Sequence, residues 1–245
     1  QMITSSRHII FWSIPVSVLF IVLRAQIVRT ILGAGKFSWN DTRLTAASLA
    51  LFTISIIAQS MLLLLIRGYY AMGNTKKPLY AGLFSGLMII LFSYGFIKIF
   101  NTFPMFQYFI ESLLRVGGIQ GTVVLMLPLG YSLALIVNCV ILAINLHNDF
   151  PEYIKSIKNT LFQSFSASVI MGSVSYLSLN LLDKIFNINT LFGIFFQGLI
   201  SGLIGLSVLV LILKLLKNIE IVEIWRTLHK KIWKAQPIAP DVPRL

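Results

Sequence analysis

The sequence predicts an all-α, polytopic membrane protein, and three observations lead to that fold class. Of the 245 residues, 57% are hydrophobic and only 11% are charged, whereas a soluble domain carries about 25% charged residues. The mean hydropathy is +0.85. Apolar runs recur that reach the roughly 20 residues a helix needs to cross a hydrocarbon core. This pattern differs from the ~10-residue alternating segments of a membrane β-barrel.

Six such runs follow one another, and we expect each to form a transmembrane helix. No domain boundary interrupts them, so residues 1–217 are predicted to form one transmembrane domain. Pro15 and Pro128 fall inside two runs and should kink their helices, whereas Pro78 lies where the first turn of a helix tolerates proline. The predicted spans are about 9–32, 44–66, 79–100, 119–144, 159–182 and 190–215.

Three segments outside the spans have patterns of their own. Residues 106–114 suit either a short helix on the membrane surface or an ordinary loop. Residues 218–236 repeat apolar side chains at spacings of three and four, with basic residues largely elsewhere. This is typical of a basic amphipathic helix on an anionic membrane surface, although docking on a protein partner is the alternative. Residues 237–245, which include three prolines, are predicted to be disordered.

The net charge of +12 predicts an orientation and not a nucleic-acid partner. Lysines and arginines gather at the ends of the spans, and no DNA- or RNA-binding motif accompanies them. With six spans, both termini share one side, which collects thirteen basic residues against five on the other. Arg24 and Arg29, inside the first span, complete the twenty. The positive-inside rule therefore predicts that both termini are cytoplasmic.

Residues for chemistry are scarce, which argues against an enzyme. None of the eight carboxylates lies in the middle of a span, where a proton relay would need one. The three histidines lie far apart in sequence, and no nucleophile motif or phosphate-binding loop occurs. The single cysteine, Cys139, excludes an internal disulfide. We expect no catalytic residue, no metal site and no cofactor.

Arg24 and Arg29 are the most informative polar residues inside the predicted spans. A central arginine costs roughly 2.5–3.5 kcal/mol on insertion scales, so it normally faces a cavity or a partner. Gln26 and Gln59 add polar groups at membrane depth. The functional interpretation is a water-accessible cavity where these residues bind an anionic headgroup. The alternative is snorkelling to the interface, together with hydrogen bonds between helices.

Small residues mark the last span. Gly198 and Gly202 form a small-xxx-small pattern that permits close helix approach, and Gly205 extends the stripe. Packing against the fifth span is one interpretation. A groove for a lipid tail, lined by the three glycines, is the other.

Three spaced elements resemble one family. The first is Leu32-Gly33-x-Gly35-x-Phe37 followed by Asp41-Thr42. The second is Arg67-x-Tyr69-Tyr70-Ala71-x-x-Asn74-Thr75-Lys76-x-Pro78, and the third is Gly118-x-x-Gly121. In this order, they resemble the C-terminal part of the MviN/MurJ lipid II flippases, within the multidrug/oligosaccharidyl-lipid/polysaccharide exporter superfamily. The resemblance gives structural roles to Gly33, Gly35, Phe37, Asp41, Arg67, Tyr70, Asn74 and Pro78. Asn74 stands where the family more often has Asp, a change that a turn tolerates.

The resemblance implies a fourteen-helix fold with two six-helix lobes around a central cavity and two extra helices. The six spans would be the last six, and the final pair would form the groove for the lipid tail. Such proteins move the undecaprenyl-linked peptidoglycan precursor to the outer leaflet of the bacterial inner membrane by alternating access. The implied partners are this pyrophosphate-linked lipid, anionic membrane lipids and the N-terminal helices of the same protein.

The hypothesis is therefore the C-terminal part of a lipid II flippase for cell-wall synthesis. The family's pyrophosphate-binding arginines lie mainly in its N-terminal part, so none of them is carried over to this sequence. Two alternatives stay open. One is an exporter of another lipid-linked saccharide or of drugs, and the other is a non-transporting membrane scaffold whose tail recruits partners.

Overall fold

The computed structural model describes residues 2–33, 37–186, 190–216, 218 and 220–222. Within these residues, six helices are long and apolar enough to cross a membrane. They are α1 (Met2–Val22), α3 (Trp39–Ala71), α4 (Lys76–Thr102), α6 (Met126–Asp149), α7 (Glu152–Leu182) and α8 (Leu191–Leu215). Two shorter helices, α2 (Arg24–Leu32) and α5 (Pro104–Leu114), and the 3-10 turn η1 (Thr122–Leu125) connect them. The predicted all-α fold class is confirmed.

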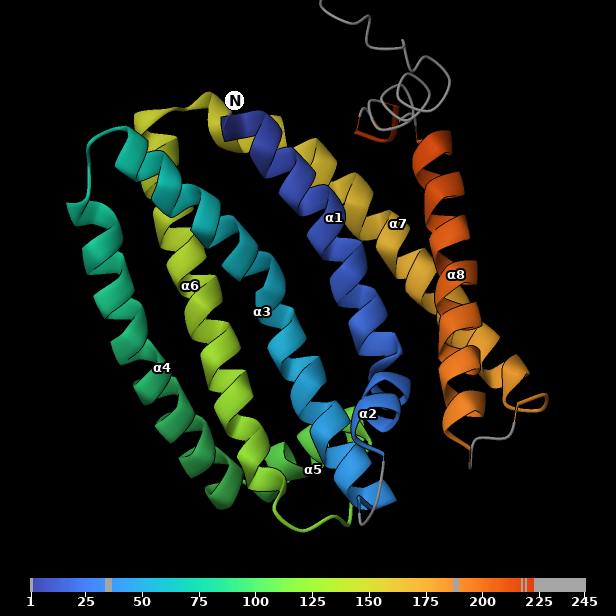
Figure 1. Ribbon diagram of the computed structural model, residues 1–245. Coiled ribbons are helices and arrows are strands. Elements are labelled where there is room, and N and C mark those ends of the chain that lie inside the picture. Colours follow the sequence, from blue (N-terminus) through green and yellow to red (C-terminus); the bar gives the residue numbers. More distant parts are fainter. Residues whose placement is uncertain (1, 34–36, 187–189, 217, 219, 223–245) are drawn as a thin grey trace, which may run out of the picture.

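The helices stand side by side in the order α4, α6, α3, α1, α7, α8, with the N-terminus at one end of the bundle and both α2 and α5 at the other (Figure 1). Helix α1 lies between α3 and α7, and α8 packs on α7 and α2. Consequently α7 and α8 adjoin the remaining helices mainly through α1 and α2.

The first span differs from its prediction. Helix α1 begins at Met2, seven residues earlier than expected, and runs through Pro15 before the chain bends at Leu23. Helix α2 then starts at Arg24. The prediction of an interior kink at Pro128 is wrong, because α6 begins at Met126 and its first turn accommodates the proline.

The structure bears differently on the three segments predicted outside the spans. The interval 106–114 is helical as part of α5, so the helix interpretation of that segment is confirmed. The amphipathic helix predicted for 218–236 and the tail 237–245 lie, apart from residues 218 and 220–222, outside the described residues.

Three clusters of buried apolar side chains hold the bundle together. One joins α1, α3, α4, α6 and α7 near the N-terminal end, and a second joins α3, α4, α5 and α6 at the opposite end. The third joins α1, α7 and α8 around Phe11 and Met171. Many of the other large apolar residues are exposed, as expected where lipid is the solvent.

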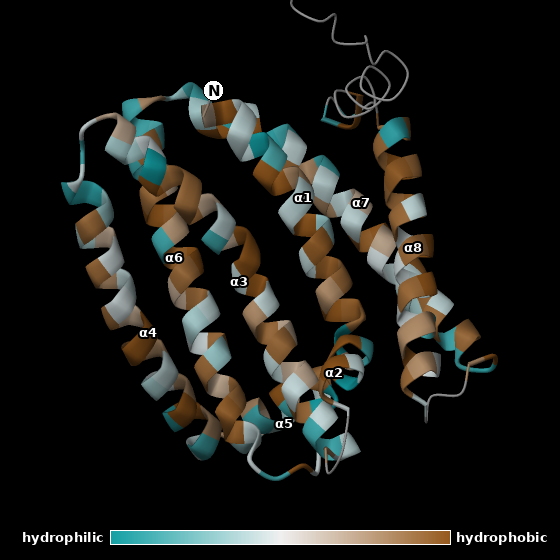
Figure 2. Ribbon diagram, in the orientation of Figure 1, coloured by the Kyte–Doolittle hydropathy of each residue, from teal (hydrophilic) through white to brown (hydrophobic). Residues whose placement is uncertain are grey.

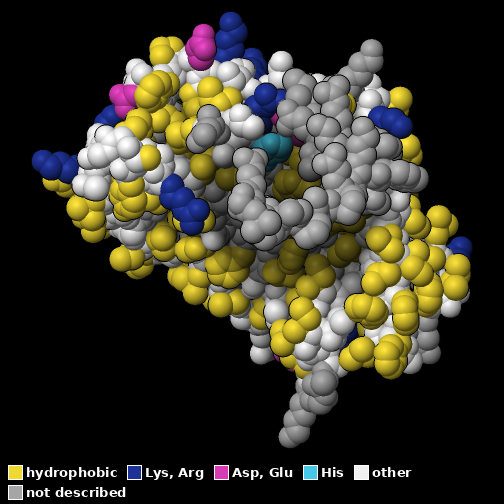
Figure 3. Space-filling model, turned by 45° about the horizontal axis from the view of Figure 1, so that its top comes forward, with side chains coloured by type: hydrophobic (Ala, Val, Ile, Leu, Met, Phe, Trp, Pro, Cys, Tyr) yellow, Lys and Arg dark blue, Asp and Glu magenta, His cyan; other side chains and the backbone are white. Residues whose placement is uncertain are grey.

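Polar residues gather where a membrane would end. In Figure 2 the middle of the long helices is mostly brown, and hydrophilic positions concentrate at helix ends and around α2. Figure 3, tilted to bring the N-terminal end forward, shows lysine and arginine side chains there and hydrophobic side chains on the flanks. Helix α4 is the most exposed span, with only 17% of its apolar window buried.

Local sequence signals explain the two connections of α3. At its start, Ser38 and Asp41 form a capping box, in which each side chain accepts from the other residue's backbone N–H. At its end, the N–H groups of Gly73 and Asn74 donate to the carbonyls of Tyr70 and Tyr69. Gly73 has φ 73°, as this Schellman ending requires. The Asn74 side chain then accepts from the N–H of Lys77, so it caps the start of α4.

Candidate functional site

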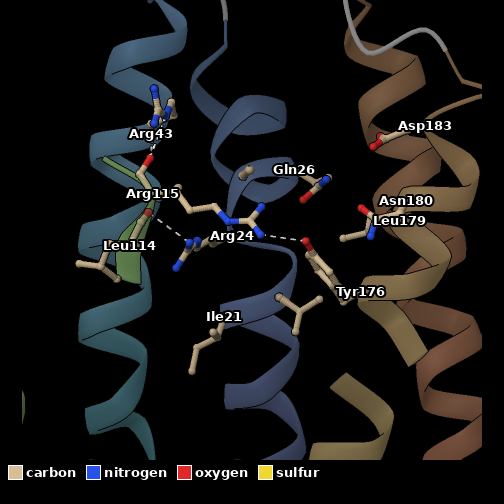
Figure 4. Close-up of a pocket in the computed structure, with 13 residues that line it drawn as sticks. Ile21, Arg24, Gln26, Arg43, Leu114, Arg115, Tyr176, Leu179, Asn180 and Asp183 are labelled. Atoms are coloured by element: carbon tan, nitrogen blue, oxygen red, sulfur yellow. Dashed lines mark hydrogen bonds between the residues drawn. The ribbon is translucent and has the colours of Figure 1, made fainter. Parts of the chain in front are cut away.

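A cavity of about 460 Å³ opens at the end of the bundle opposite the N-terminus, between α2, α3, α5 and α7 (Figure 4). We call it the cationic cavity because three arginines line it. Its walls comprise Ile21, Val22, Arg24, Ala25, Gln26, Arg43, Ala46, Leu114, Arg115, Tyr176, Leu179, Asn180 and Asp183.

The three arginines are held by backbone and hydroxyl oxygens. Arg24 Nη2 donates to the carbonyl of Leu114 at 3.2 Å, and Arg115 Nη2 donates to the hydroxyl of Tyr176 at 3.0 Å. Arg43 donates from Nε at 2.9 Å, and also from Nη2, to the carbonyl of Arg115. Figure 4 shows the guanidinium groups of Arg24 and Arg115 together in the centre of the cavity, where their like charges repel.

Arg115 has an unusual backbone conformation. It ends α5 with φ 58° and ψ 41°, the left-handed region that normally selects glycine. Among the described residues, no other non-glycine residue has a positive φ. The carbonyl contact from Arg43 supports this turn from α3. Side-chain hydrogen bonds to the buried Glu111 from Thr122 (2.6 Å) and Gln107 (3.0 Å) fix the helix that precedes it.

The cavity carries unbalanced positive charge. Within the described part of the chain, no ion pair joins Arg24, Arg43 or Arg115 to a carboxylate. Asp183 also lines the cavity, but its carboxylate accepts from Gln197 of α8. Guanidinium groups without carboxylate partners can donate charge-assisted hydrogen bonds to an anion, and phosphate suits their fork geometry.

An apolar groove of about 450 Å³ adjoins the cationic cavity. It runs between α1, α2 and α8 and is lined by Leu19, Leu23, Gln26, Ile27, Thr30, Ile31, Phe195, Gly198, Leu199, Gly202, Leu203 and Leu206. Gln26 lines both spaces, and its buried Oε1 has no hydrogen-bond partner among the described residues. The groove and the cavity therefore meet at Gln26, as a polar head and an apolar tail of one ligand would require.

The structure separates the four predicted headgroup residues. Arg24 and Gln26 line the cationic cavity. Arg29 instead donates to the Phe37 carbonyl at 2.8 Å and lies 4.8 Å from the centre of the Trp39 ring, so it ties α2 to the start of α3. Gln59 is exposed in the middle of α3, bonded to Ser55 at 2.7 Å, and lies in neither space.

The three predicted groove glycines do not all line the groove. Gly198 and Gly202 line the apolar groove, where added Cβ atoms would approach Gln26 Cβ at 3.0 Å and Leu23 Cδ1 at 3.2 Å. Gly205 faces α7, and an added Cβ would collide with Ser175 Oγ. Gly205 thus packs against the fifth span, while the other two permit close approach of α8 to α2.

The residues of the family pattern cluster at the two connections of α3. Gly33 ends α2, Phe37 accepts from Arg29, and Asp41 completes the capping box. Arg67 and Tyr70 are exposed near the end of α3, while Asn74 and Pro78 belong to the start of α4. Gly35 lies outside the described residues.

Five further polar residues of the cationic cavity were not predicted from the sequence: Arg43, Arg115, Tyr176, Asn180 and Asp183. In the sequence, Arg43 and Arg115 counted only as charges on one side of the membrane. Both were predicted to lie on the side of the membrane where the first span ends, and this shared side could have indicated that they lie near Arg24. Nothing local indicated that residues 72 apart, such as Arg43 and Arg115, would meet.

A comparison of the sequence with protein-family models identifies its family. Residues 1–201, about four fifths of the chain, match the family described as lipid II flippase MurJ. Comparisons with curated proteins and with solved structures gave no match. The six apolar helices agree with a multi-pass inner-membrane protein, and the description of the family implies a lipid-linked substrate. The chain belongs to the lipid II flippase MurJ family.

Proposed function

We propose that this chain acts as the C-terminal part of a flippase that moves undecaprenyl-pyrophosphate-linked peptidoglycan precursor from the inner to the outer leaflet by alternating access. The observation that carries the proposal is the junction at Gln26 of a cavity with three arginines and an apolar groove. Family membership supplies the class of substrate, a lipid-linked peptidoglycan precursor.

The proposed headgroup site is the cationic cavity. Arg24 and Arg115 point into it and would donate to phosphate oxygens, with Arg43 adding charge from α3. The unpartnered Oε1 of Gln26 would accept from a hydroxyl or amide of the headgroup. In this assignment, Arg29 and Gln59 are not headgroup contacts, because neither lines the cavity.

The proposed tail site is the apolar groove, with Gly198 and Gly202 as its α8 wall. The missing side chains let α8 approach Gln26 and Leu23 closely, and an isoprenyl chain would lie in the groove beside this contact. With both termini cytoplasmic, as the lysine and arginine bias predicts, the cavity and groove would open toward the outer leaflet.

The charge of the cavity favours this function over drug export. Export of cationic drugs would need a carboxylate facing the ligand, and Asp183 is instead engaged by Gln197. A scaffold role would rest on the C-terminal segment, which lies almost entirely outside the described residues.

Binding of a short isoprenyl diphosphate tests the proposal. We expect the whole protein in lipid nanodiscs to bind farnesyl diphosphate at least tenfold more tightly than farnesol or inorganic diphosphate, because each of these engages only one of the two spaces. Arg115→Gly should weaken farnesyl diphosphate about tenfold, since hydrogen bonds to charged groups contribute roughly 1.5–3 kcal/mol. Isothermal titration calorimetry measures the affinities of the wild type for the three ligands and of the Arg115→Gly variant for farnesyl diphosphate.

Arg115→Gly has a built-in control for folding. Glycine adopts the left-handed conformation of residue 115 without strain, so the variant should melt at or above the wild-type temperature. Equal affinity for farnesyl diphosphate and farnesol in the wild-type protein would contradict the proposed headgroup site. So would unchanged binding in the Arg115→Gly variant.

A further inference from the structure

We propose that α7 and α8 swing as one unit about a polar hinge at the N-terminal end of the bundle, and that the Arg115–Tyr176 contact is the gate this motion opens over the cationic cavity. The inference deepens the proposed function by assigning the regulation of its site, and it rests on that function only for the identity of the ligand.

Helices α7 and α8 are fastened to each other at both ends. Near the cavity, Gln197 donates to the carbonyl of Leu179 at 3.2 Å and to the carboxylate of Asp183. At the opposite end, Asn218, in the segment after α8, donates from Nδ2 to Gln163 Oε1 of α7 at 2.8 Å. Between these points α8 packs closely on α7, with Gly205 against Ser175. These contacts should keep α7 and α8 together when the pair moves relative to the other helices.

The hinge end of the pair is bound firmly to α1. The buried hydroxyls of Ser6 and Tyr153 share a hydrogen bond of 2.7 Å. Arg7 pairs with Glu220 at 2.7 Å, and Thr160 donates to the same carboxylate at 2.9 Å. Glu220 is only 2% exposed. This network, which we call the Arg7–Glu220 latch, links α1, α7 and the segment after α8 at one point.

Beyond the latch, the contact between the described residues of α1 and α7 rests on packing. Among the described residues, Ser6–Tyr153 is the last hydrogen bond between the two helices, and the buried hydroxyls of Ser164 and Ser168 on α7 have no hydrogen-bond partner there. Gly172 faces Val18, whose Cγ1 would lie 2.6 Å from an added Cβ. The rest of this contact includes Phe11 of α1 and Met171 of α7, so it is apolar and non-directional, and packed helices can shear past one another along such a contact.

At the cavity end, the pair is held by the packing of Gly198 and Gly202 of α8 on Gln26 and Leu23, and by few hydrogen bonds. There, the described hydrogen bonds join α7 to the end of α5 only through Arg115 Nη2 and the Tyr176 hydroxyl, at 3.0 Å. The Arg115 guanidinium also lies 5.8 Å from the centre of the Tyr176 ring. Tyr176 is 41% exposed, so water readily replaces this contact.

An anion in the cavity would compete directly with Tyr176. Arg115 points into the cavity and already lies beside the like charge of Arg24, so a phosphate group relieves that repulsion as it binds. If the guanidinium turns to the phosphate, Tyr176 loses its partner and α7 is free to move away from α5. Ligand entry thereby shifts the gate toward its open state through differential contacts in the two states.

Distance measurements between spin labels test the hinge and the gate together. In a Cys139→Ser background, the exposed Leu113 and Leu177 are changed to cysteine to label the gate, and the exposed Thr4 and Ile154 to label the hinge. Pulsed electron paramagnetic resonance is recorded on the whole protein in nanodiscs, alone, with farnesyl diphosphate and with farnesol as the uncharged control.

We expect a second, longer gate distance whose population rises at least threefold with farnesyl diphosphate but not with farnesol. Tyr176→Phe, which removes only the hydroxyl, should raise the same population without ligand. The hinge distance should stay constant throughout. A gate distance that Tyr176→Phe leaves unchanged, or a hinge distance that shifts as much as the gate distance, would overturn the proposal.

The outcomes separate this inference from the proposed function. Opening by Tyr176→Phe without any response to farnesyl diphosphate would support the hinge and contradict the proposed ligand. Binding of farnesyl diphosphate with a gate that neither ligand nor Tyr176→Phe moves would support the ligand and overturn the hinge. Thermal melting of Tyr176→Phe verifies that the variant is folded.

Discussion

Replacing Arg24 with alanine in the whole protein is expected to reduce lipid II transport at least tenfold. Arg24 donates to the Leu114 carbonyl and points into the cationic cavity, where it is one of three arginines without a carboxylate partner in the described structure. Loss of one charge-assisted hydrogen bond to a phosphate corresponds to about 1.5–3 kcal/mol, or roughly a 10- to 150-fold loss of affinity. Transport of labelled lipid II into the outer leaflet of reconstituted vesicles measures the effect.

Arg29→Ala is the matched control for Arg24→Ala. Both arginines belong to α2, but Arg29 contacts Phe37 and Trp39 outside the cavity. We expect Arg29→Ala to lower the melting temperature while transport by the folded protein changes less than threefold. Arg24→Lys should retain part of the activity, because lysine keeps the charge without the fork geometry. Equal loss of transport in Arg24→Ala and Arg29→Ala would argue against the assignment of the headgroup contact to Arg24.

The Arg7→Met substitution should destabilise the fold by about 3 kcal/mol. It leaves the carboxylate of Glu220 buried without its cation, and breaking a buried ion pair from one side costs roughly 3–5 kcal/mol. The lower end applies because the Arg7 side chain keeps 25% of its surface exposed. The double variant Arg7→Met/Glu220→Met should recover most of this loss, since apolar replacement of a whole pair is often neutral. The free energy of unfolding in bicelles measures both changes.

The latch also predicts that the free energy of unfolding depends on pH. Burial raises the pKa of Glu220, but hydrogen bonds from its own backbone, Thr160 and Arg7, together with the charge of Arg7, outweigh burial and leave the pKa below its ordinary value. A lowered folded-state pKa contributes stability above the unfolded pKa, about 4.3, that is lost as pH falls through the folded pKa. Acidification below pH about 4 should therefore destabilise the wild type more than the double variant. Parallel pH curves would show that the latch contributes nothing.

The sequence was sufficient to predict features that depend on local composition. The length of the apolar runs predicted the six spans. Asn74 accepts a hydrogen bond at the start of α4, and Pro78 lies in the first turn of that helix, as the sequence predicted. The sequence was insufficient where distant segments meet. Arg7 and Glu220 lie 213 positions apart, and their pairing depends on how α1, α7 and α8 pack. Likewise, a glycine stripe does not reveal which neighbour it faces, and here Gly202 faces Leu23 at the bend after α1 while Gly205 faces α7.

The bend at Leu23 sets the depth of the cavity in the bilayer. Helix α1 has 21 residues, which at 1.5 Å each extend about 31 Å, close to the thickness of the hydrocarbon core. If α1 spans that core, Arg24 lies at its edge and not near its centre, where an arginine is most costly. A lipid bound at Arg24 would then keep its phosphates level with those of the surrounding leaflet. The protein could accept or release such a ligand sideways, without drawing its charge into the hydrocarbon.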